Sequence, residues 1–114
     1  MSESYGPHER IRAKKDFQRL YKRGRCFRGK YFTLITLPNG LDRPRMAAVT
    51  SRKVGCAVVR NRFRRRAREL FRRSKDLIDR PLDILVIARP EAGGLGWSDM
   101  KTEYLKALEA VRRG

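Results

Sequence analysis

The stretch SRKVGCAVVRNRFRRRAREL, residues 51–70, decides the fold, because it joins a turn to an arginine-packed helical pattern. From residue 57 to residue 74, mainly apolar residues recur every three or four positions and so share one face, as expected of a helix packed on a core. On a helical wheel this face spans an arc of roughly 120°. Its members are Val59, Phe63, Ala67, Leu70, Phe71 and Ser74.

The rest of this helical surface is almost entirely arginine. Its flanks carry Asn61, Arg64, Arg65, Arg68 and Arg72 on one side and Arg62, Arg66 and Arg73 on the other. Glu69 is the only acid, and we expect no partner charges at i+3 or i+4 on this face, so it is not an ordinary salt-bridged surface. A merely solubilising face is the alternative, but solubility does not require so many arginines. We interpret the face as a polyanion-binding surface whose fixed guanidinium groups follow a folded RNA backbone by shape.

Composition supports a polyanionic partner. The chain has 114 residues, which fits one small domain over residues 1–114, and 29 Lys plus Arg against 12 Asp plus Glu give a net charge of +17. Such a charge destabilises the compact state unless a partner neutralises it. No apolar run approaches the ~18 residues of a membrane span. No leader-like apolar run is seen, so we expect a cytoplasmic protein, with Cys26 and Cys56 as reduced thiols.

The sequence predicts an α+β fold with helices packed on one mixed, four-stranded sheet in the order αβββαβα. Residues 1–10 are expected to form a mobile arm. Asp16 is predicted to cap a first helix that ends at Gly24. Strands are expected at residues 25–28, 31–37, 45–51 and 82–88. A last helix is expected to follow Trp97, with Ser98 as its N-cap and an apolar stripe of Met100, Tyr104, Leu108 and Val111.

Catalytic constellations are weak in this sequence. His8 is the only histidine, and it lies in the expected arm. Asp76, Asp79 and Asp83 could be imagined as a two-metal carboxylate set, but they span a helix end, a turn and a strand start, in surroundings that repel cations. We therefore expect no catalytic residues and no bound metal in the protein itself.

The central motif resembles the signature of the bacterial ribonuclease P protein subunit. The matching residues are Ser51, Arg52, Lys53, Val54, Gly55, Ala57, Val58, Arg60, Asn61, Arg62, Arg64 and Arg65. Asp16, Phe17, Tyr21 and Gly24 fit the family's first helix, and residues 83–90 resemble its late strand. The resemblance covers roughly residues 10–112.

This resemblance implies both a fold and a function. The fold is a single-domain α-β sandwich with a left-handed crossover around the arginine-rich helix, against the general rule for such connections. The function is that of an accessory subunit of an RNA-based endoribonuclease. Its partners are the catalytic RNA and precursor tRNA, whose 5′ leader is removed, with no membrane and no obligate protein partner. The RNA and its Mg²⁺ ions carry the chemistry.

The resemblance also implies two sets of contact residues. Those expected to bind the catalytic RNA are Arg52, Lys53, Arg60, Asn61, Arg62, Arg64, Arg65, Arg66 and Arg68. Those expected to bind the leader are Phe17, Tyr21, Ile35, Arg60 and Asn61, although the family often has an aromatic residue where Ile35 stands. From the pattern alone, Phe17 is favoured as a core residue, whereas Tyr21 fits the core and a base-stacking role equally well. Asn61 could read a base edge or hydrogen-bond locally.

Two other functions compete with this reading. A structural RNA binder, such as a ribosomal protein or an RNA chaperone, could have the same composition. It would need neither the ordered signature of residues 52–65 nor aromatic residues beside the basic helix. A DNA-binding helix is less favoured, because arginines line both flanks, whereas reading the major groove requires one narrow polar face.

Overall fold

A computed structural model of the chain describes residues 9–78 and 80–113. It confirms the predicted order of three helices and four strands and the α+β class. The elements are α1 (Lys14–Arg23), β1 (Arg25–Arg28), β2 (Phe32–Pro38), β3 (Arg45–Val49), α2 (Ala57–Arg73), η2 (Lys75–Leu77), β4 (Leu82–Ala88), η3 (Pro90–Gly94) and α3 (Trp97–Arg113). Of the expected arm, residues 1–8 lie outside the described residues. Glu9 pairs with Lys75, and Arg10 bridges to Met46 of β3.

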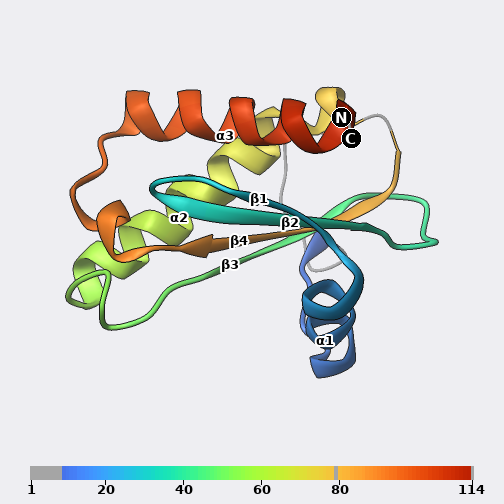
Figure 1. Ribbon diagram of the computed structural model, residues 1–114, viewed down its shortest axis with the longest axis horizontal. Coiled ribbons are helices and arrows are strands. Elements are labelled where there is room, and N and C mark those ends of the chain that lie inside the picture. Colours follow the sequence, from blue (N-terminus) through green and yellow to red (C-terminus); the bar gives the residue numbers. More distant parts are fainter. Residues whose placement is uncertain (1–8, 79, 114) are drawn as a thin grey trace.

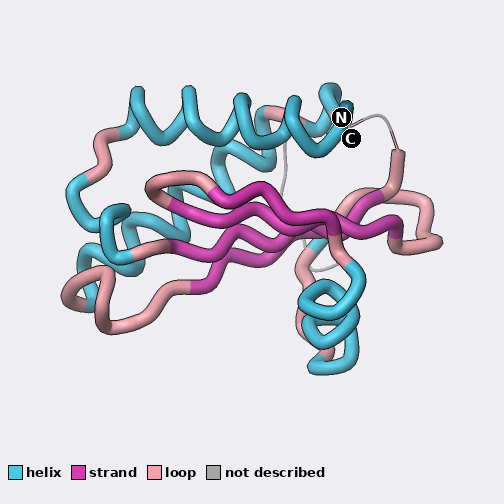
Figure 2. The backbone as a smooth tube through the Cα atoms, in the orientation of Figure 1, coloured by secondary structure: helices cyan, strands magenta, loops and turns pink. Residues whose placement is uncertain are grey.

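The four strands form one mixed sheet in the order β1-β2-β4-β3. β2 is antiparallel to both β1 and β4, whereas β3 and β4 are parallel. Figures 1 and 2 show α2 and α3 on one side of this sheet and α1 on the other. The strands therefore carry apolar residues on both faces, and β4 is buried from Leu82 to Val86.

The β3–α2–β4 connection has the left-handed sense that the resemblance implies. The Arg89 N–H donates to the Tyr31 carbonyl, so odd-numbered residues of β4 turn their amides toward β2 and even-numbered ones toward β3. Even-numbered Ile84 and Val86 direct their side chains to the α2 face. For L-residues viewed from that face with β4 running upward, β3 then lies to the right. The chain passes in front of the sheet from right to left, which is a left-handed crossover.

The predicted buried face of α2 is confirmed. Phe63, Ala67 and Leu70 pack with Ile84 and Val86 of β4 in the main core. The expected stripe of α3 joins the same core through Met100, Tyr104, Leu108 and Val111. A second, smaller cluster lies beneath α1 on the opposite face of the sheet, where Leu20, Ile35 and Leu85 are buried.

Both predicted side-chain N-caps are wrong. Helix α1 is capped by Ala13 without a side-chain hydrogen bond, and Asp16 lies inside its first turn. The Asp16 carboxylate instead contacts Arg45 of β3 at 3.4 Å, so a tertiary ion pair replaces the local cap. Helix α3 begins at Trp97, one residue before the expected cap Ser98. The C-cap prediction is confirmed, because the Gly24 N–H donates to the Leu20 carbonyl at 2.9 Å.

The two edge strands of the sheet, β1 and β3, differ in length and in what lies beside them. β1, one edge strand, has only four residues, and its Arg25 and Arg28 are exposed. β3, the other edge strand, meets the segment that precedes α1. There the Ile11 N–H donates to the Met46 carbonyl at 3.2 Å.

Tyr104 links α3 to the end of α2 and provides a pH-dependent test of the core. Its hydroxyl shares a hydrogen bond of 2.9 Å with Ser74, and burial raises the pKa of Tyr104 to about 12. A tyrosine in the unfolded chain ionises near 10. The folded state therefore binds the proton more tightly, and its stability falls as the pH rises from about 10 to about 12.

We expect Tyr104→Phe to remove about 2 kcal/mol of the stability loss between pH 9 and pH 12. Urea denaturation of both proteins at each pH measures the difference, and the lysines that titrate in the same range cancel in the comparison. If the two proteins lost stability equally over this range, buried Tyr104 would not be the cause.

Candidate nucleic-acid interface

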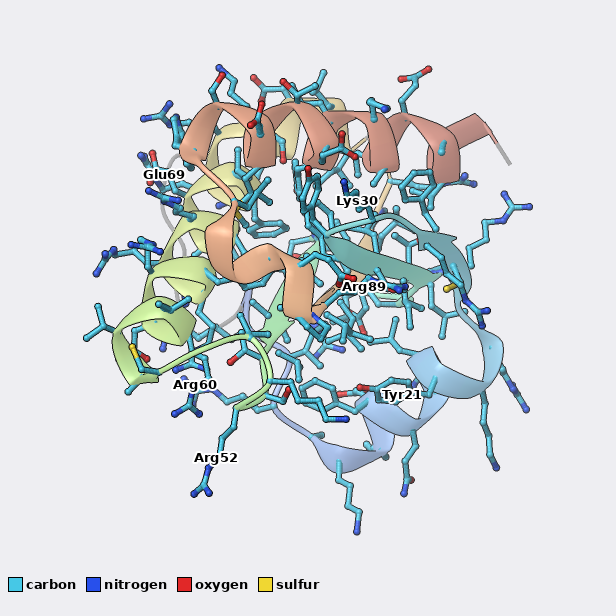
Figure 3. All side chains as sticks on the ribbon, turned by 60° about the vertical axis from the view of Figure 1, so that its left-hand side comes forward. Tyr21, Lys30, Arg52, Arg60, Glu69 and Arg89 are labelled. Carbon is cyan, nitrogen blue, oxygen red and sulfur yellow. The ribbon has the colours of Figure 1, made fainter. Side chains whose placement is uncertain are left out.

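The basic surface begins at the turn before α2. The Val54 N–H donates to Ser51 and the Gly55 N–H donates to Arg52, which folds residues 51–55 tightly and leaves Arg52 and Lys53 exposed. Gly55 has φ +153, and a Cβ there would lie 3.0 Å from Val59, so other residues would be strained. Figure 3 shows Arg52 and Arg60 projecting from this end of α2 on the side where Tyr21 of α1 lies.

Arg64 ties this part of α2 to the end of β3. Its guanidinium donates to the Thr50 hydroxyl at 2.9 Å and to the side-chain oxygen of Asn61. Of the roles open for Asn61, the local hydrogen bond is therefore present, although its side chain stays exposed. The Nε of half-buried Arg60 is itself buried and has no hydrogen-bond partner in the described part of the chain. Leaving such an atom unpaired costs about 1–3 kcal/mol.

Other arginines of α2 have partners within the protein. Arg66 turns toward η3 and donates to the Leu95 carbonyl at 3.1 Å. The expectation of no partner charges at i+3 or i+4 is wrong near the end of α2, where Glu69 pairs with Arg72 and Arg73. Hydrogen bonds from these two arginines hold the pKa of the Glu69 carboxyl below the usual value. Because Arg66, Arg72 and Arg73 have these partners, they are less available to RNA than the other arginines of the helix. The exposed residues that remain among the expected RNA contacts include Asn61, Arg65 and Arg68.

A groove of about 300 Å³ runs between α1 and α2 over β3, and we call it the α1–α2 groove. Its lining residues are Arg10, Ile11, Arg12, Phe17, Ala47, Ala48, Val49 and Arg68. The structure thus brings Phe17, an expected leader contact, together with Arg68, an expected contact for the catalytic RNA. The floor is apolar and the rims are basic, which suits a strand that has both bases and phosphates.

The remaining expected leader contacts differ in how accessible they are. Tyr21 is 58% exposed on α1, so its ring is open to a ligand. Ile35 is only 6% exposed and lies in the cluster beneath α1, which leaves little surface for a leader to touch. Gly24 allows this close packing, because a Cβ there would lie 2.3 Å from Ile35.

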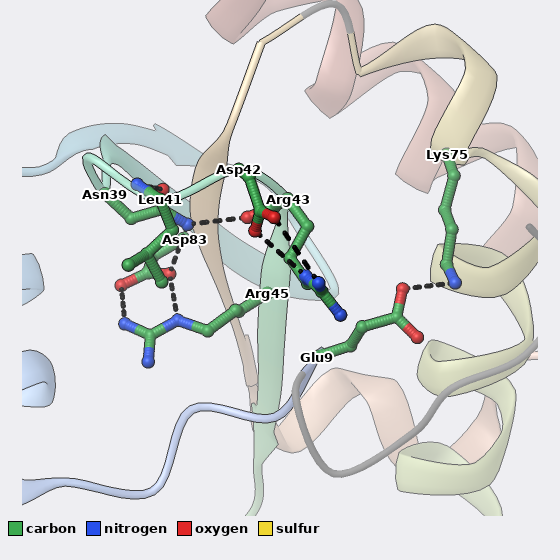
Figure 4. A network of polar contacts seen from close by, with 8 residues as sticks. All are labelled: Glu9, Asn39, Leu41, Asp42, Arg43, Arg45, Lys75 and Asp83. Carbon is green, nitrogen blue, oxygen red and sulfur yellow. Dashed lines mark hydrogen bonds and ion pairs between the residues drawn. The ribbon is translucent and has the colours of Figure 1, made fainter.

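Asp83, the most deeply placed of the acids considered for metal binding, is an ion-pair partner. Its carboxylate is 1% exposed and accepts bonds from Arg45 at 2.7 and 2.8 Å and from Asn39 at 3.0 Å (Figure 4). These bonds raise the pKa of Arg45. Asp76 is exposed, and Asp79 lies outside the described residues. Sequence reasoning missed this network, although a lone acid within the apolar run of residues 82–88 was a signal that it has a buried partner.

Through Arg45, this network also positions α1. The same guanidinium that binds Asp83 of β4 contacts Asp16 of α1 at 3.4 Å. Arg45 therefore holds the helix that carries Phe17 and Tyr21 against the sheet.

The state of the two cysteines and the apolar character of the helices were also predicted from the sequence. Cys26 and Cys56 are free, as predicted, and both are exposed. Cys56 is the N-cap of α2, and hydrogen bonds from the backbone N–H groups of Val59 and Val58 lower the pKa of its thiol. Among the described residues, no helix has the length and apolar character needed to cross a membrane.

Known proteins match most of the chain. The family model described as Ribonuclease P matches residues 6–112. The ribonuclease P protein component of Thermotoga maritima is 42% identical over 89 residues, which cover 78% of this chain and 76% of that protein. The Syntrophobacter fumaroxidans component is 40% identical over 105 residues, covering 91% and 88%.

Solved structures agree with the sequence matches. A Staphylococcus aureus RNase P protein mutant with defective mRNA degradation activity superimposes with a TM-score of 0.84 at 31% identity, covering 92% of this chain and 89% of that one. The Thermotoga maritima RNase P protein gives a TM-score of 0.80 at 33% identity, covering 90% and 96%. Both likenesses extend over nearly the whole fold.

Proposed function

Since this chain belongs to the ribonuclease P protein family, a family of tRNA-processing subunits, we propose that it binds the catalytic RNA of that enzyme together with the 5′ leader of precursor tRNA. In this role it assists the Mg²⁺-dependent removal of the leader in the cytoplasm. The observation that carries the proposal is the α1–α2 groove, where an aromatic residue of α1 faces an arginine of α2 over an apolar floor.

The catalytic RNA is assigned to the turn before α2 and to the outer face of that helix. Arg52 and Lys53 are exposed at the turn, and Arg65 and Arg68 are exposed on the helix. Each guanidinium can grip a phosphate through two parallel N–H groups. Arg64 is already held by Thr50 and Asn61, so less side-chain entropy is lost when it meets a phosphate.

The leader is assigned to the α1–α2 groove and to the adjoining surface of Tyr21. A single strand binds by stacking its bases on aromatic rings while its backbone follows basic side chains. Phe17 and Tyr21 lie one helical turn apart on α1, and Arg12 and Arg68 line the groove. Arg60, which is half-buried, supplies a further guanidinium near the start of α2.

The chemistry is assigned to the partner RNA and its Mg²⁺ ions. Asp83, the buried acid of β4, is held by Arg45 and Asn39, which leaves it ill suited to bind Mg²⁺. The protein contributes positive charge where two RNA molecules meet, which lowers their mutual repulsion and with it the Mg²⁺ concentration that cleavage requires.

The test incubates precursor tRNA with the protein alone, with the catalytic RNA alone and with both, at low Mg²⁺. We expect efficient cleavage only when both are present, and cleavage by the RNA alone when Mg²⁺ is raised. Cleavage by the protein alone would contradict the assignment of chemistry to the RNA.

A structural RNA binder remains the competing function, and the leader distinguishes the two. The complex of protein and catalytic RNA should bind leader-bearing tRNA more tightly than leaderless tRNA, because only the former reaches the α1–α2 groove. Equal affinities would favour the structural role.

Tyr21→Ala is expected to weaken the binding of leader-bearing precursor tRNA by about ten-fold, because the loss of one stacked base costs ~1–3 kcal/mol. The side chain is 58% exposed, so the fold should be little affected. Equilibrium binding to the assembled complex, with precursor and mature tRNA in parallel, measures the effect.

Tyr21→Phe is the matched control, since it keeps the ring and removes only the hydroxyl. It should bind the leader nearly as the unaltered protein does. If Tyr21→Ala weakened mature tRNA to the same extent as the precursor, the assignment of Tyr21 to the leader would be wrong.

A further inference from the structure

A second basic hollow lies at the end of the sheet away from the turn before α2. It has a volume of about 370 Å³, and we call it the sheet-end pocket. Its lining residues are Arg23, Arg25, Thr36, Leu37, Pro38, Arg80, Leu82 and Val111. None of these residues belongs to the family signature. None of them lies on α2 or lines the α1–α2 groove.

The local chain geometry brings the arginines together. Arg23 is the last residue of α1 and Arg25 is the first of β1, separated only by the C-cap Gly24. Arg25 pairs with Thr36 in the sheet, and Pro38 pairs with Leu82, so the end of β2 and the start of β4 meet at this edge. Arg80 lies two residues before β4. Residues from distant parts of the sequence thus converge at one end of the sheet.

Two of the arginines that line the sheet-end pocket, Arg23 and Arg25, are not paired with an acid of the described residues. Of the described residues that line it, none is acidic. Neither Arg23 nor Arg25 forms an ion pair with a carboxylate among residues 9–78 and 80–113. Arg23 offsets the negative end of the α1 dipole, but Arg25 belongs to a strand and has no such role. An arrangement of this kind favours an anionic ligand.

The chemistry of the lining favours a phosphate of an RNA backbone. Guanidinium groups bind phosphate oxygens bidentately, and the apolar side chains of Leu37, Pro38 and Leu82 can pack against a ribose or a base. Thr36, the remaining polar side chain, is buried, so the accessible polar groups of the pocket are its guanidinium groups, which we assign to phosphates. Binding here would depend on the backbone and not on the sequence of the RNA.

The sheet-end pocket lies far from the turn before α2, which is the proposed contact for the catalytic RNA. β4 runs for seven residues from the pocket at Leu82 to Ala88, and strands rise ~3.3 Å per residue, which places about 20 Å between the two ends. The turn before α2 lies at the far end, where a Cβ on Gly93 would meet the Val54 carbonyl at 2.3 Å. In Figure 1 these two ends are the opposite ends of the long axis of the molecule.

We propose that the sheet-end pocket binds the backbone of the catalytic RNA at a segment separate from the one held by α2. The inference rests on the proposed function, because it takes the catalytic RNA as the partner. The protein then bridges two parts of that RNA and so favours the folded arrangement in which both parts reach it.

The first experiment measures how the affinity for the catalytic RNA depends on KCl concentration. The double variant Arg23→Ala/Arg25→Ala should bind about ten-fold more weakly near 0.1 M salt, with a salt slope shallower by about 1–2, because it loses two phosphate contacts. Lys101→Ala/Lys106→Ala on α3 removes the same number of charges away from the pocket and should change the slope less. An unchanged slope for the arginine variant would overturn the proposal.

The second experiment uses the two native thiols, which lie near the two contact regions. A hydroxyl-radical-generating group is attached to Cys26, beside Arg25, in a Cys56→Ser background, and to Cys56 in a Cys26→Ser background. We expect the two probes to cleave separate segments of the catalytic RNA. Cleavage from Cys56 without cleavage from Cys26 would overturn the sheet-end contact and leave the proposed function intact. The absence of cleavage from both would contradict both proposals.

A third measurement separates an RNA backbone from a small free anion. Inorganic pyrophosphate is titrated while the NMR signals of Arg23 and Arg25 are followed. Saturable pyrophosphate binding, combined with an unchanged RNA salt slope in the arginine variant, would assign the pocket to a small anion and overturn the proposal. Competition between pyrophosphate and RNA at these residues would support it.

Discussion

Asp83→Ala is expected to lower the free energy of unfolding by about 3 kcal/mol. The Asp83 carboxylate accepts two bonds from Arg45 and one from Asn39, and it is buried within β4. Without it, the largely buried Arg45 guanidinium keeps, among the acids of the described residues, only the contact with Asp16 at 3.4 Å. The cost therefore comes mainly from a buried charge left without its partner. Urea denaturation followed by circular dichroism measures the change.

Asp42→Ala provides the control for Asp83→Ala. Asp42 forms an ion pair with Arg43 at the surface, with a distance of 3.1 Å, and exposed pairs of this kind contribute about 0–1 kcal/mol. We expect the control to change stability by less than half as much as Asp83→Ala does. Similar effects for the two variants would mean that the buried network does not stabilise the sheet.

The triple variant Arg64→Ala/Arg65→Ala/Arg68→Ala is expected to bind the catalytic RNA about 100-fold more weakly near 0.1 M salt. Each lost phosphate contact should also make the salt slope shallower by ~0.7–0.9, about 2–3 for all three. The reason is that fewer counterions are released from the RNA on binding. A filter-binding series over KCl concentration gives both the affinity and the slope, and circular dichroism confirms that the variant is folded.

Arg72→Ala/Arg73→Ala, at the other end of the same helix, is the matched comparison. Both guanidinium groups pair with Glu69, so part of their charge is already neutralised. The change in salt slope per arginine should therefore be smaller than in the triple variant. An equal change per arginine would show that α2 acts as a uniform cylinder of charge, without a defined contact face.

The sequence predicted the elements well where local periodicity controls them. The apolar run of residues 82–88 became β4 with unchanged bounds, and the 3.6-residue period placed the buried face of α2 on Phe63, Ala67 and Leu70. The N-cap of α1 was mispredicted, because the Asp16 carboxylate is used in a tertiary contact with Arg45 that no local pattern reveals. The hand of the crossover came only from the family resemblance, since the general rule favours the opposite hand.

The candidate site was predicted in part, for a similar reason. The sequence showed the arginines of α2, but it did not show which of them bind partners within the protein and which stay exposed. Arg66 is turned aside by the carbonyl of Leu95, which lies 29 residues away in the chain. The sheet-end pocket was missed entirely, because its arginines belong to a helix end, a strand start and a turn, and only the sheet register brings them together.

The edges of the sheet have a consequence for the protein before it meets RNA. An open edge strand can pair with the edge of another molecule and so start aggregation. β1 is short and carries the exposed arginines Arg25 and Arg28, so two such edges repel each other. On the other side, the segment at Ile11 already occupies part of the edge of β3. Arg25 would therefore serve twice, keeping separate molecules from joining into fibres and later gripping a phosphate.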